Sequence, residues 1–258
     1  MDKNRIQITW YGTASVRICA GSSELLIDPF FPFPDSHVKV PADAFEGCSH
    51  ILISHGHYDH IGSISRIVRP GCKVYCTRAP YLTLLRKGVS RSELRLIRAG
   101  SVLHIGQFRI NAIKGAHIRL GAPKILKKLF YRRVWKYRRG IVRKLLRFAS
   151  CLEKKETLCY LIEAYGKRIL VLGSLALAPD TDYPRDADIV FFPYQGTDDM
   201  SGPVAEIYRR LSPKAVLLTH YDDTFPPFST ETDTTETEKY LGELTAVHKL
   251  RHGDSLFI

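Results

Sequence analysis

Four side chains that can bind a metal ion fall within six residues of one another in the segment His55-Gly-His57-Tyr-Asp59-His60. Imidazole nitrogens and carboxylate oxygens are the groups that hold transition-metal ions in proteins. Alternate residues of an extended turn point the same way, so His55 and His57 can share one ion, while Asp59 and His60 can face a neighbouring one. A histidine-rich surface loop is the alternative, but this combination directly after an apolar run favours a metal site.

The elements around this cluster are predicted from apolar patterns and turn residues. A continuous apolar run at 50–54 predicts a buried strand that delivers the chain to the histidines. Short strands separated by glycines, with one or two helices between them, fill the first 120 residues. The later residues predict a hairpin at 157–172, buried strands at 188–192 and 215–219, and helices at 203–211 and 234–244. This order of strands with helices between them predicts two sheets packed face to face with helices outside.

The cluster matches the motif His-x-His-x-Asp-His, and two further segments extend the match, Trp10-Tyr-Gly12-Thr13-Ala14 and Leu26-Ile27-Asp28-Pro29. In these residues the sequence resembles the metallo-β-lactamase-fold hydrolases, in particular the branch that contains the L-ascorbate-6-phosphate lactonases and similar hydrolases. The resemblance implies an α/β (α+β) fold, a four-layer αββα sandwich of two mixed sheets with outer helices and the metal site at one sheet edge. We expect residues 1–258 to form a single domain with a basic helical insertion at about 119–156.

By that resemblance, His117 completes the ligands of the first ion beside His55 and His57, and His220 joins Asp59 and His60 at the second. A single histidine at a strand end is more often structural, but both follow apolar runs at the edge where the cluster lies. Asp59 and His220 are also assigned catalytic roles, Asp59 by orienting the attacking water. One or two divalent ions are expected, with zinc favoured and manganese or iron as alternatives. The remaining histidines are predicted to be ordinary residues: His37, His50, His104, His248 and His252.

The sequence departs from the family pattern at Gly173-Ser174, where the family has Gly-Asp and the aspartate bridges both ions. A serine hydroxyl is a far weaker ligand than a carboxylate. Three alternatives follow for an active protein: one ion dominates, a water or substrate oxygen takes the bridge, or Asp222 or Asp223 compensates from beside His220. A dead enzyme is a fourth alternative, against which the six other donors argue. Asp28 and Ser174 are predicted to contact ligands rather than the ion.

A basic segment carries the net charge of +12, because Arg119 to Arg147 hold twelve Lys and Arg and no acidic residue, leaving 26 of each sign elsewhere. Apolar residues recur in it at helical spacing, which predicts an amphipathic helix bent near Gly140: Leu126, Phe130, Val134, Tyr137, Ile141, Leu145 and Phe148. The helix could pack on the domain with a solvated charged face, or bind an anionic partner. Interspersed aromatic residues favour peripheral contact with an anionic membrane through 119–148 over nucleic acid.

The apolar runs are too short to cross a bilayer and the N-terminus shows no secretion signal, so a cytoplasmic location is expected, with peripheral contact at the inner membrane surface as a variant. The apolar segment 30–34 directly after Asp28 predicts either a lid over the site or a rigid turn with its rings in the core.

The predicted function is hydrolysis of an ester, lactone or phosphoester by a metal-activated water, with a small anionic substrate favoured by the basic segment. The alternative is a non-catalytic lipid- or nucleic-acid-binding protein on a degenerate metallohydrolase fold.

Overall fold

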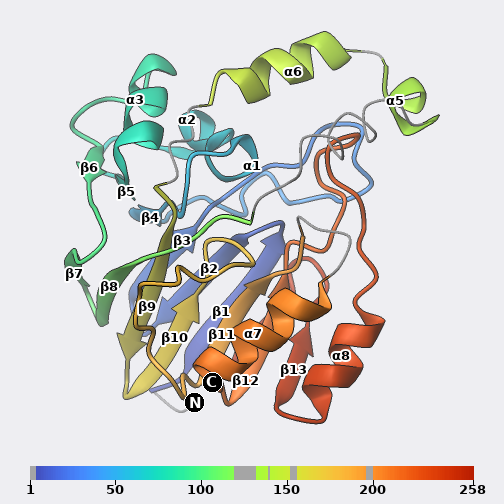
Figure 1. Cartoon of the computed structure of the whole chain (residues 1–258). Helices are drawn as coiled ribbons and strands as arrows, with labels where there is room; N and C mark the ends of the chain where they lie inside the picture. Colours follow the sequence, from blue (N-terminus) through green and yellow to red (C-terminus); the bar gives the residue numbers. More distant parts are fainter. Residues whose placement is uncertain (1–3, 119–131, 139, 152–155, 196–199) are drawn as a thin grey trace.

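A computed structural model describes residues 4–118, 132–138, 140–151, 156–195 and 200–258, and in this part of the chain the strands form two seven-stranded sheets (Figure 1). The first sheet has the order β14-β1-β2-β3-β4-β5-β6, with β1 (Ile6–Gly12), β2 (Ser15–Ala20), β3 (Ser23–Ile27), β4 (His50–Leu52), β5 (Lys73–Cys76), β6 (Leu94–Leu96) and β14 (Ser255–Phe257). The second has the order β13-β12-β11-β10-β9-β8-β7, with β7 (Val102–Ile105), β8 (Phe108–Lys114), β9 (Leu158–Ala164), β10 (Lys167–Val171), β11 (Ile189–Pro193), β12 (Ala215–Thr219) and β13 (Ala246–Lys249).

Both sheets are mixed, as predicted. In the first, β14, β1, β2 and β3 pair antiparallel, whereas β3 to β6 pair parallel. In the second, β10 to β13 pair parallel, and β7, β8, β9 and β10 pair antiparallel. Strands β8, β10 and β12 therefore run in one direction, as do β3 and β4, so the residues that follow these strands can meet at one edge of the sandwich.

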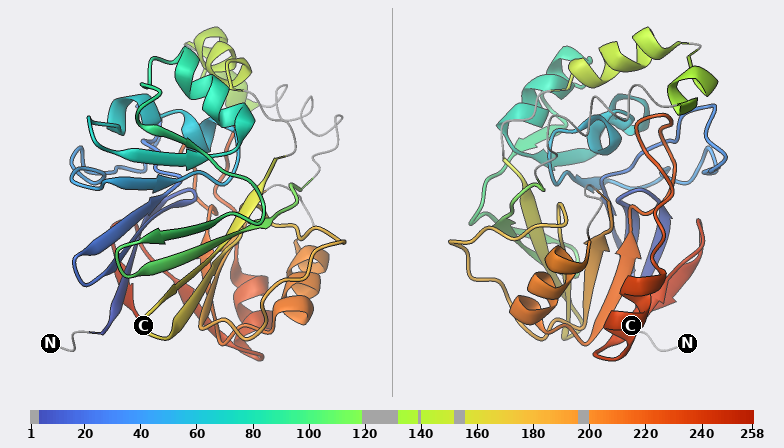
Figure 2. Two further views of the ribbon diagram at one scale, coloured as in Figure 1. Left: turned by 90° about the vertical axis from the view of Figure 1, so that its left-hand side faces the viewer. Right: turned by 45° about the vertical axis from the view of Figure 1, so that its right-hand side comes forward.

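Helices cover the outer faces of the sheets (Figures 1 and 2). The described helices are α1 (Tyr58–Ile61), α2 (Ile64–Ile67), α3 (Arg78–Arg86), α5 (Arg132–Lys136), α6 (Ile141–Ala149), α7 (Ser201–Leu211) and α8 (Thr235–Gly242). Apolar residues of α1, α2 and α3 share a buried cluster with β3 to β6, whereas α7 and α8 pack with the second sheet and the inter-sheet core. In the part of the chain that the structure describes, none of these helices could span a membrane.

Trp10 illustrates the core between the sheets. Its ring is fully buried, tilts against Tyr221 at 4.9 Å and donates its indole N–H to the Thr13 carbonyl at 2.9 Å. The alternating pattern of β1 puts Ile6 and Ile8 on the same buried face. Strand β1 and the turn that follows it are thus held in place by the apolar core between the sheets.

Two short elements are finer than the sequence patterns resolve. Residues 58–67 contain two separate four-residue helices, α1 and α2, because the chain already turns at His57, inside the metal motif. Strand β6 is only Leu94–Leu96, too short to show a pattern. In the basic segment, Gly140 has a left-handed backbone (φ 75°) between α5 and α6, while the expected stretch 119–131 lies outside the described residues.

Candidate metal centre

The motif loop begins at His55, three residues after the end of β4, and ends in the first turn of α1. His57 occupies the N-cap of α1, and its carbonyl accepts the backbone N–H groups of His60 and Ile61, both at 3.1 Å. The extended backbone before this turn carries His55 and His57, and the helical turn carries Asp59 and His60. A change from extended to helical geometry within six residues therefore divides the motif into two groups of donors.

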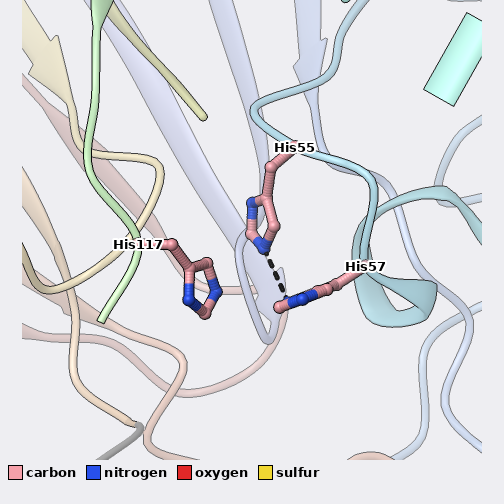
Figure 3. Close-up of side chains that lie close together, drawn as sticks. All are labelled: His55, His57 and His117. Carbon is pink, nitrogen blue, oxygen red and sulfur yellow. Dashed lines mark hydrogen bonds between the residues drawn. The ribbon is translucent and has the colours of Figure 1, made fainter. Parts of the chain in front are cut away.

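The first group consists of His55, His57 and His117, whose ligand atoms all lie within 4.8 Å of one another. The three imidazole rings lie together in Figure 3, with His55 and His57 coming from the motif loop and His117 from the segment after β8. His55 Nε2 is 3.1 Å from His57 Nδ1, and the His117 ring centroid is 4.9 Å and 4.5 Å from those of His55 and His57. This arrangement could hold a metal ion.

The second group consists of Asp59, His60 and His220, again with ligand atoms within 4.8 Å of one another. Asp59 Oδ2 is 2.9 Å from His220 Nε2 and 3.5 Å from His60 Nε2. Burial alone would raise the pKa of Asp59, but the neighbouring His60 and His220 outweigh burial and leave the pKa below its usual range. The His55 and His60 rings are 3.9 Å apart, so the two groups are adjacent.

Hydrogen bonds on the far side of the rings orient His55 and His60. The Asp28 carboxylate accepts the Ser54 hydroxyl at 2.5 Å and faces His60 Nδ1 at 2.8 Å, so His60 donates from Nδ1. Because the Ser54 hydroxyl proton is directed to Asp28, its oxygen accepts from His55 Nδ1 at 3.0 Å. These contacts place the lone pair of each histidine on Nε2, as a metal ligand requires.

The same logic applies to His117, whose Nδ1 lies 2.7 Å from the Ile118 carbonyl and must donate to it. The pKa of His55 is held well below its ordinary value by burial and by the neighbouring His60, His57 and His117. His55 is therefore a neutral imidazole, which is the form that binds metal.

His220 follows β12 with a left-handed backbone (φ 62°), a rare conformation for a residue other than glycine. Its N–H donates to the Thr13 carbonyl at 2.8 Å, and the Thr13 N–H in turn lies 3.0 Å from both oxygens of Asp222. Asp222 also faces His252 Nε2 at 2.9 Å. Asp222 and His252 therefore position the His220 loop against the β1–β2 turn, a role that the sequence did not reveal.

These contacts bear on the alternative that Asp222 or Asp223 replaces the missing bridge. Asp222 is engaged with the β1–β2 turn, and Asp223 accepts the Ser229 hydroxyl at 2.6 Å. Among the groups of described residues that could hold an ion, neither aspartate appears. The structure thus gives no support to that alternative.

Ser174 is buried and contacts the chain beside His117, because its hydroxyl accepts the Ile118 N–H at 3.2 Å. The preceding Gly173 is required by close packing: a Cβ there would lie 2.3 Å from the Leu158 carbonyl and 3.2 Å from Ser54 Cβ. The segment after β10 therefore touches both the His117 loop and the start of the motif loop.

The two donor groups differ in how far they are buried. His55, Asp59, His60 and His220 are buried, whereas His57 and His117 are half-buried. The first group is therefore the more accessible of the two.

The two alternatives for segment 30–34 can now be compared. Phe30 and Phe33 are 2% and 3% exposed and pack on Tyr58, with ring centroids at 5.8 Å and 5.7 Å. They form a small aromatic core rather than a free lid.

Two mixed sheets with adjacent His/Asp groups at the strand ends define the class of proteins with the metallo-β-lactamase fold. Residues 7–220 match the family described as the beta-lactamase superfamily domain, and the chain belongs to this superfamily.

Curated relatives support the same class. A UPF0173 metal-dependent hydrolase of Methylobacterium nodulans is 34% identical over 116 residues, which are 43% of this chain and 48% of the relative. One from Agrobacterium fabrum is 32% identical over 114 residues, with the same shares. The chain thus spans about half the length of the curated relatives it matches.

Solved structures show the same fold. Igni18, a metallo hydrolase of Ignicoccus hospitalis, superposes with a TM-score of 0.65 at 17% identity, covering 99% of both chains. The metallo-beta-lactamase fold protein YhfI of Bacillus subtilis gives 0.58 at 16% identity, covering 99% of this chain and 100% of its own.

Proposed function

We propose that this protein holds one or two divalent ions in the two donor groups and hydrolyses an ester, lactone or phosphoester bond of a small anionic molecule. The observation that carries the proposal is the convergence of three imidazoles whose possible ligand atoms lie within 4.8 Å of one another, beside a second group of one carboxylate and two imidazoles. Six donors from the segments after β4, β8 and β12 would not gather in this way for packing alone.

The donor set fits a transition ion. Neutral imidazole nitrogens suit zinc and iron, and the Asp59 carboxylate also suits manganese. The pKa of His55, lowered by burial, keeps a lone pair available at neutral pH. Zinc is the favoured ion. When bound, a divalent ion supplies a nucleophile from water near neutral pH and polarises the attacked carbonyl or phosphoryl group.

The residues of the chain take complementary roles in this proposal. Asp59, anionic because its pKa is lowered, orients the attacking water and also serves as a ligand. His220, whose Nε2 lies 2.9 Å from Asp59 Oδ2, would hold that carboxylate in place and join it as a ligand of the second ion. Asp28 and Ser54 hold His60 and His55 in the tautomers that bind metal.

The substrate reaches the ions past His57 and His117, the half-buried pair. An anionic group is favoured because the basic segment lies next to this region in the chain, and a phosphorylated lactone, as in the branch that the sequence resembles, is the first candidate.

Turnover of bis(p-nitrophenyl) phosphate and of simple lactones should be measured on protein stripped of metal and then supplied with zinc, manganese or iron. We expect metal-dependent turnover of at least one substrate. The variant pair His55→Ala and His117→Ala should lose at least about a hundredfold in kcat/KM, whereas His104→Ala, an exposed histidine on β7, should retain full activity.

Ser174 favours a second candidate, a non-catalytic lipid- or nucleic-acid-binding protein, because the bridging carboxylate of the family is replaced by a hydroxyl. Complete inactivity on every substrate under every metal condition, with the fold intact by circular dichroism, would support this binding protein over the hydrolase.

A further inference from the structure

Helix α6 is anchored on the domain by one face. Lys144 is buried, and its Nζ donates to Asp35 Oδ2 at 2.5 Å and to the Pro226 carbonyl at 2.7 Å. One turn later, the Phe148 ring packs on Tyr58, between the motif residues His57 and Asp59, with centroids 5.0 Å apart. These contacts fix which side of α6 faces the protein and which side faces solvent.

The opposite face of α6 is apolar and exposed. Val142, Leu145 and Leu146 expose 66%, 42% and 66% of their surface, and Ala149 is also exposed. The spacing i, i+3, i+4 and i+7 puts these four residues on one stripe. Trp135 on the neighbouring α5 is 69% exposed. An ordinary surface helix buries its apolar stripe, whereas α6 buries a lysine and presents the stripe to solvent.

Positive charge surrounds this stripe. Four cations here are exposed: Arg143 and Arg147 of α6, Lys136 at the end of α5 and Arg138 after it. The sequence has no acidic residue between Glu93 and Glu153, so nothing nearby along the chain neutralises them. A surface that is both apolar and cationic complements the boundary between anionic lipid headgroups and acyl chains.

The position of the helices in the molecule suits a planar partner. In Figures 1 and 2, α5 and α6 lie at the end of the molecule remote from the two termini, and α1 and α2 lie between α6 and the sheets. We propose that the exposed face of α5 and α6, defined by Trp135, Val142, Leu145 and Leu146 with the flanking cations, docks on an anionic lipid bilayer. This interaction goes beyond the proposed hydrolysis and does not depend on it.

Two other occupants fit less well. A second copy of the chain on this face would bring its arginines against those of the first and leave them without acidic partners. Nucleic acid would account for the arginines, but phosphate contacts leave the exposed Val142 and Leu146 unexplained.

Co-sedimentation of the full chain with vesicles tests the proposal. We expect binding to vesicles of phosphatidylglycerol and phosphatidylcholine, and much weaker binding to phosphatidylcholine alone. The double variant Val142→Ser/Leu146→Ser should lower the partition coefficient at least about tenfold, because its apolar surface no longer enters the bilayer. Leu96→Ser/Leu244→Ser removes leucines that are 61% and 45% exposed elsewhere and should bind as the native chain does.

A charge variant separates the contribution of the cations to vesicle binding from that of the apolar stripe. Arg138→Gln/Arg143→Gln should weaken binding to anionic vesicles and reduce its sensitivity to salt. The proposal is overturned if the native chain does not sediment with anionic vesicles, or if Val142→Ser/Leu146→Ser, folded by circular dichroism, sediments equally. Sedimentation velocity that shows a dimer abolished by the same variant would assign the face to a second copy. Oligonucleotide binding that depends on the arginines but not on Leu146, without vesicle binding, would assign it to nucleic acid.

Discussion

The nitrogen atoms that face away from the centre decide how each histidine can bind an ion. Nδ1 of His55, His60 and His117 donates to Ser54, Asp28 and the Ile118 carbonyl respectively. A histidine whose outer nitrogen is fixed in this way loses little freedom when its inner nitrogen binds metal. Metal affinity should therefore depend on residues that never touch the ion.

Asp28→Asn tests this dependence. The amide can no longer act as an anionic acceptor for both His60 Nδ1 and the Ser54 hydroxyl, so we expect metal affinity to fall about 10- to 100-fold. Competition with a chromophoric chelator measures the change. The matched control is Asp254→Asn, whose carboxylate pairs with Arg251 at the surface and should leave the affinity unchanged. Equal affinities for native protein and Asp28→Asn would contradict the assigned role of Asp28.

Ser174→Asp should restore a carboxylate at the position where the family has its bridging ligand. We expect the zinc content of saturated, dialysed Ser174→Asp to exceed that of the native protein, because two cations can then share an anionic oxygen. Ser174→Ala is the control, since it removes the contact with the Ile118 N–H without adding charge. An unchanged metal content in Ser174→Asp would show that residue 174 does not lie between the two ions.

Among single residues, the donors could be predicted but several of their partners could not. The motif indicated four of the six donors and the family resemblance implied the other two, His117 and His220; the structure brings all six together in two groups. For Ser54, the sequence offers one indication of its role: it is a polar residue next to His55 at the end of an apolar strand. The contacts of Asp222 and His252 could not be predicted, because Thr13 and Asp222 are 209 residues apart in sequence and only the fold brings them together.

At the scale of elements, close approach of strand ends determines the site. The segment after β10 passes so near to the start of β9 that only glycine fits at position 173. Gly173→Ala should lower the free energy of unfolding by about 1 to 3 kcal/mol, because backbone atoms must move apart. Chemical denaturation measures it. Gly202→Ala, in α7 with open space around it, should be neutral or slightly stabilising. Similar effects of both variants would contradict the packing argument.

The local stability of helix α6 should depend on its buried lysine, Lys144. Lys144→Ala removes the contacts with Asp35 and the Pro226 carbonyl, so we expect the amides of α6 to exchange with deuterium at least about tenfold faster while those of α7 are unaffected. Arg143→Ala, an exposed change one residue away, should leave exchange as it is. Slow exchange of α6 in Lys144→Ala would mean that Phe148 alone anchors the helix.

Elements with strong local patterns could be predicted from the sequence. The hairpin of β9 and β10 and the buried strands β11 and β12 have long apolar runs bounded by turn residues, and the structure confirms them. The division into α1 and α2 could not be predicted, because both helices have only four residues and are fixed by tertiary contacts. For α6, periodicity revealed an apolar stripe but not which part of it faces the protein.

At the scale of the whole molecule, the two sheets bring distant segments to one edge. The class of architecture followed from the alternation of strands and helices, and the structure confirms two mixed sheets. The strand order did not follow, since β14 pairs with β1 across nearly the full length of the chain. Such pairings come from burial of the common core and not from local sequence.

The central claim is that His55, His57 and His117 bind a common ion. Anomalous diffraction from crystals grown with zinc, recorded on both sides of the zinc absorption edge, tests it directly. We predict a peak about 2.0 to 2.1 Å from His55 Nε2, His57 Nδ1 and His117 Nε2. A map with no peak among these three atoms at saturating zinc would contradict the account.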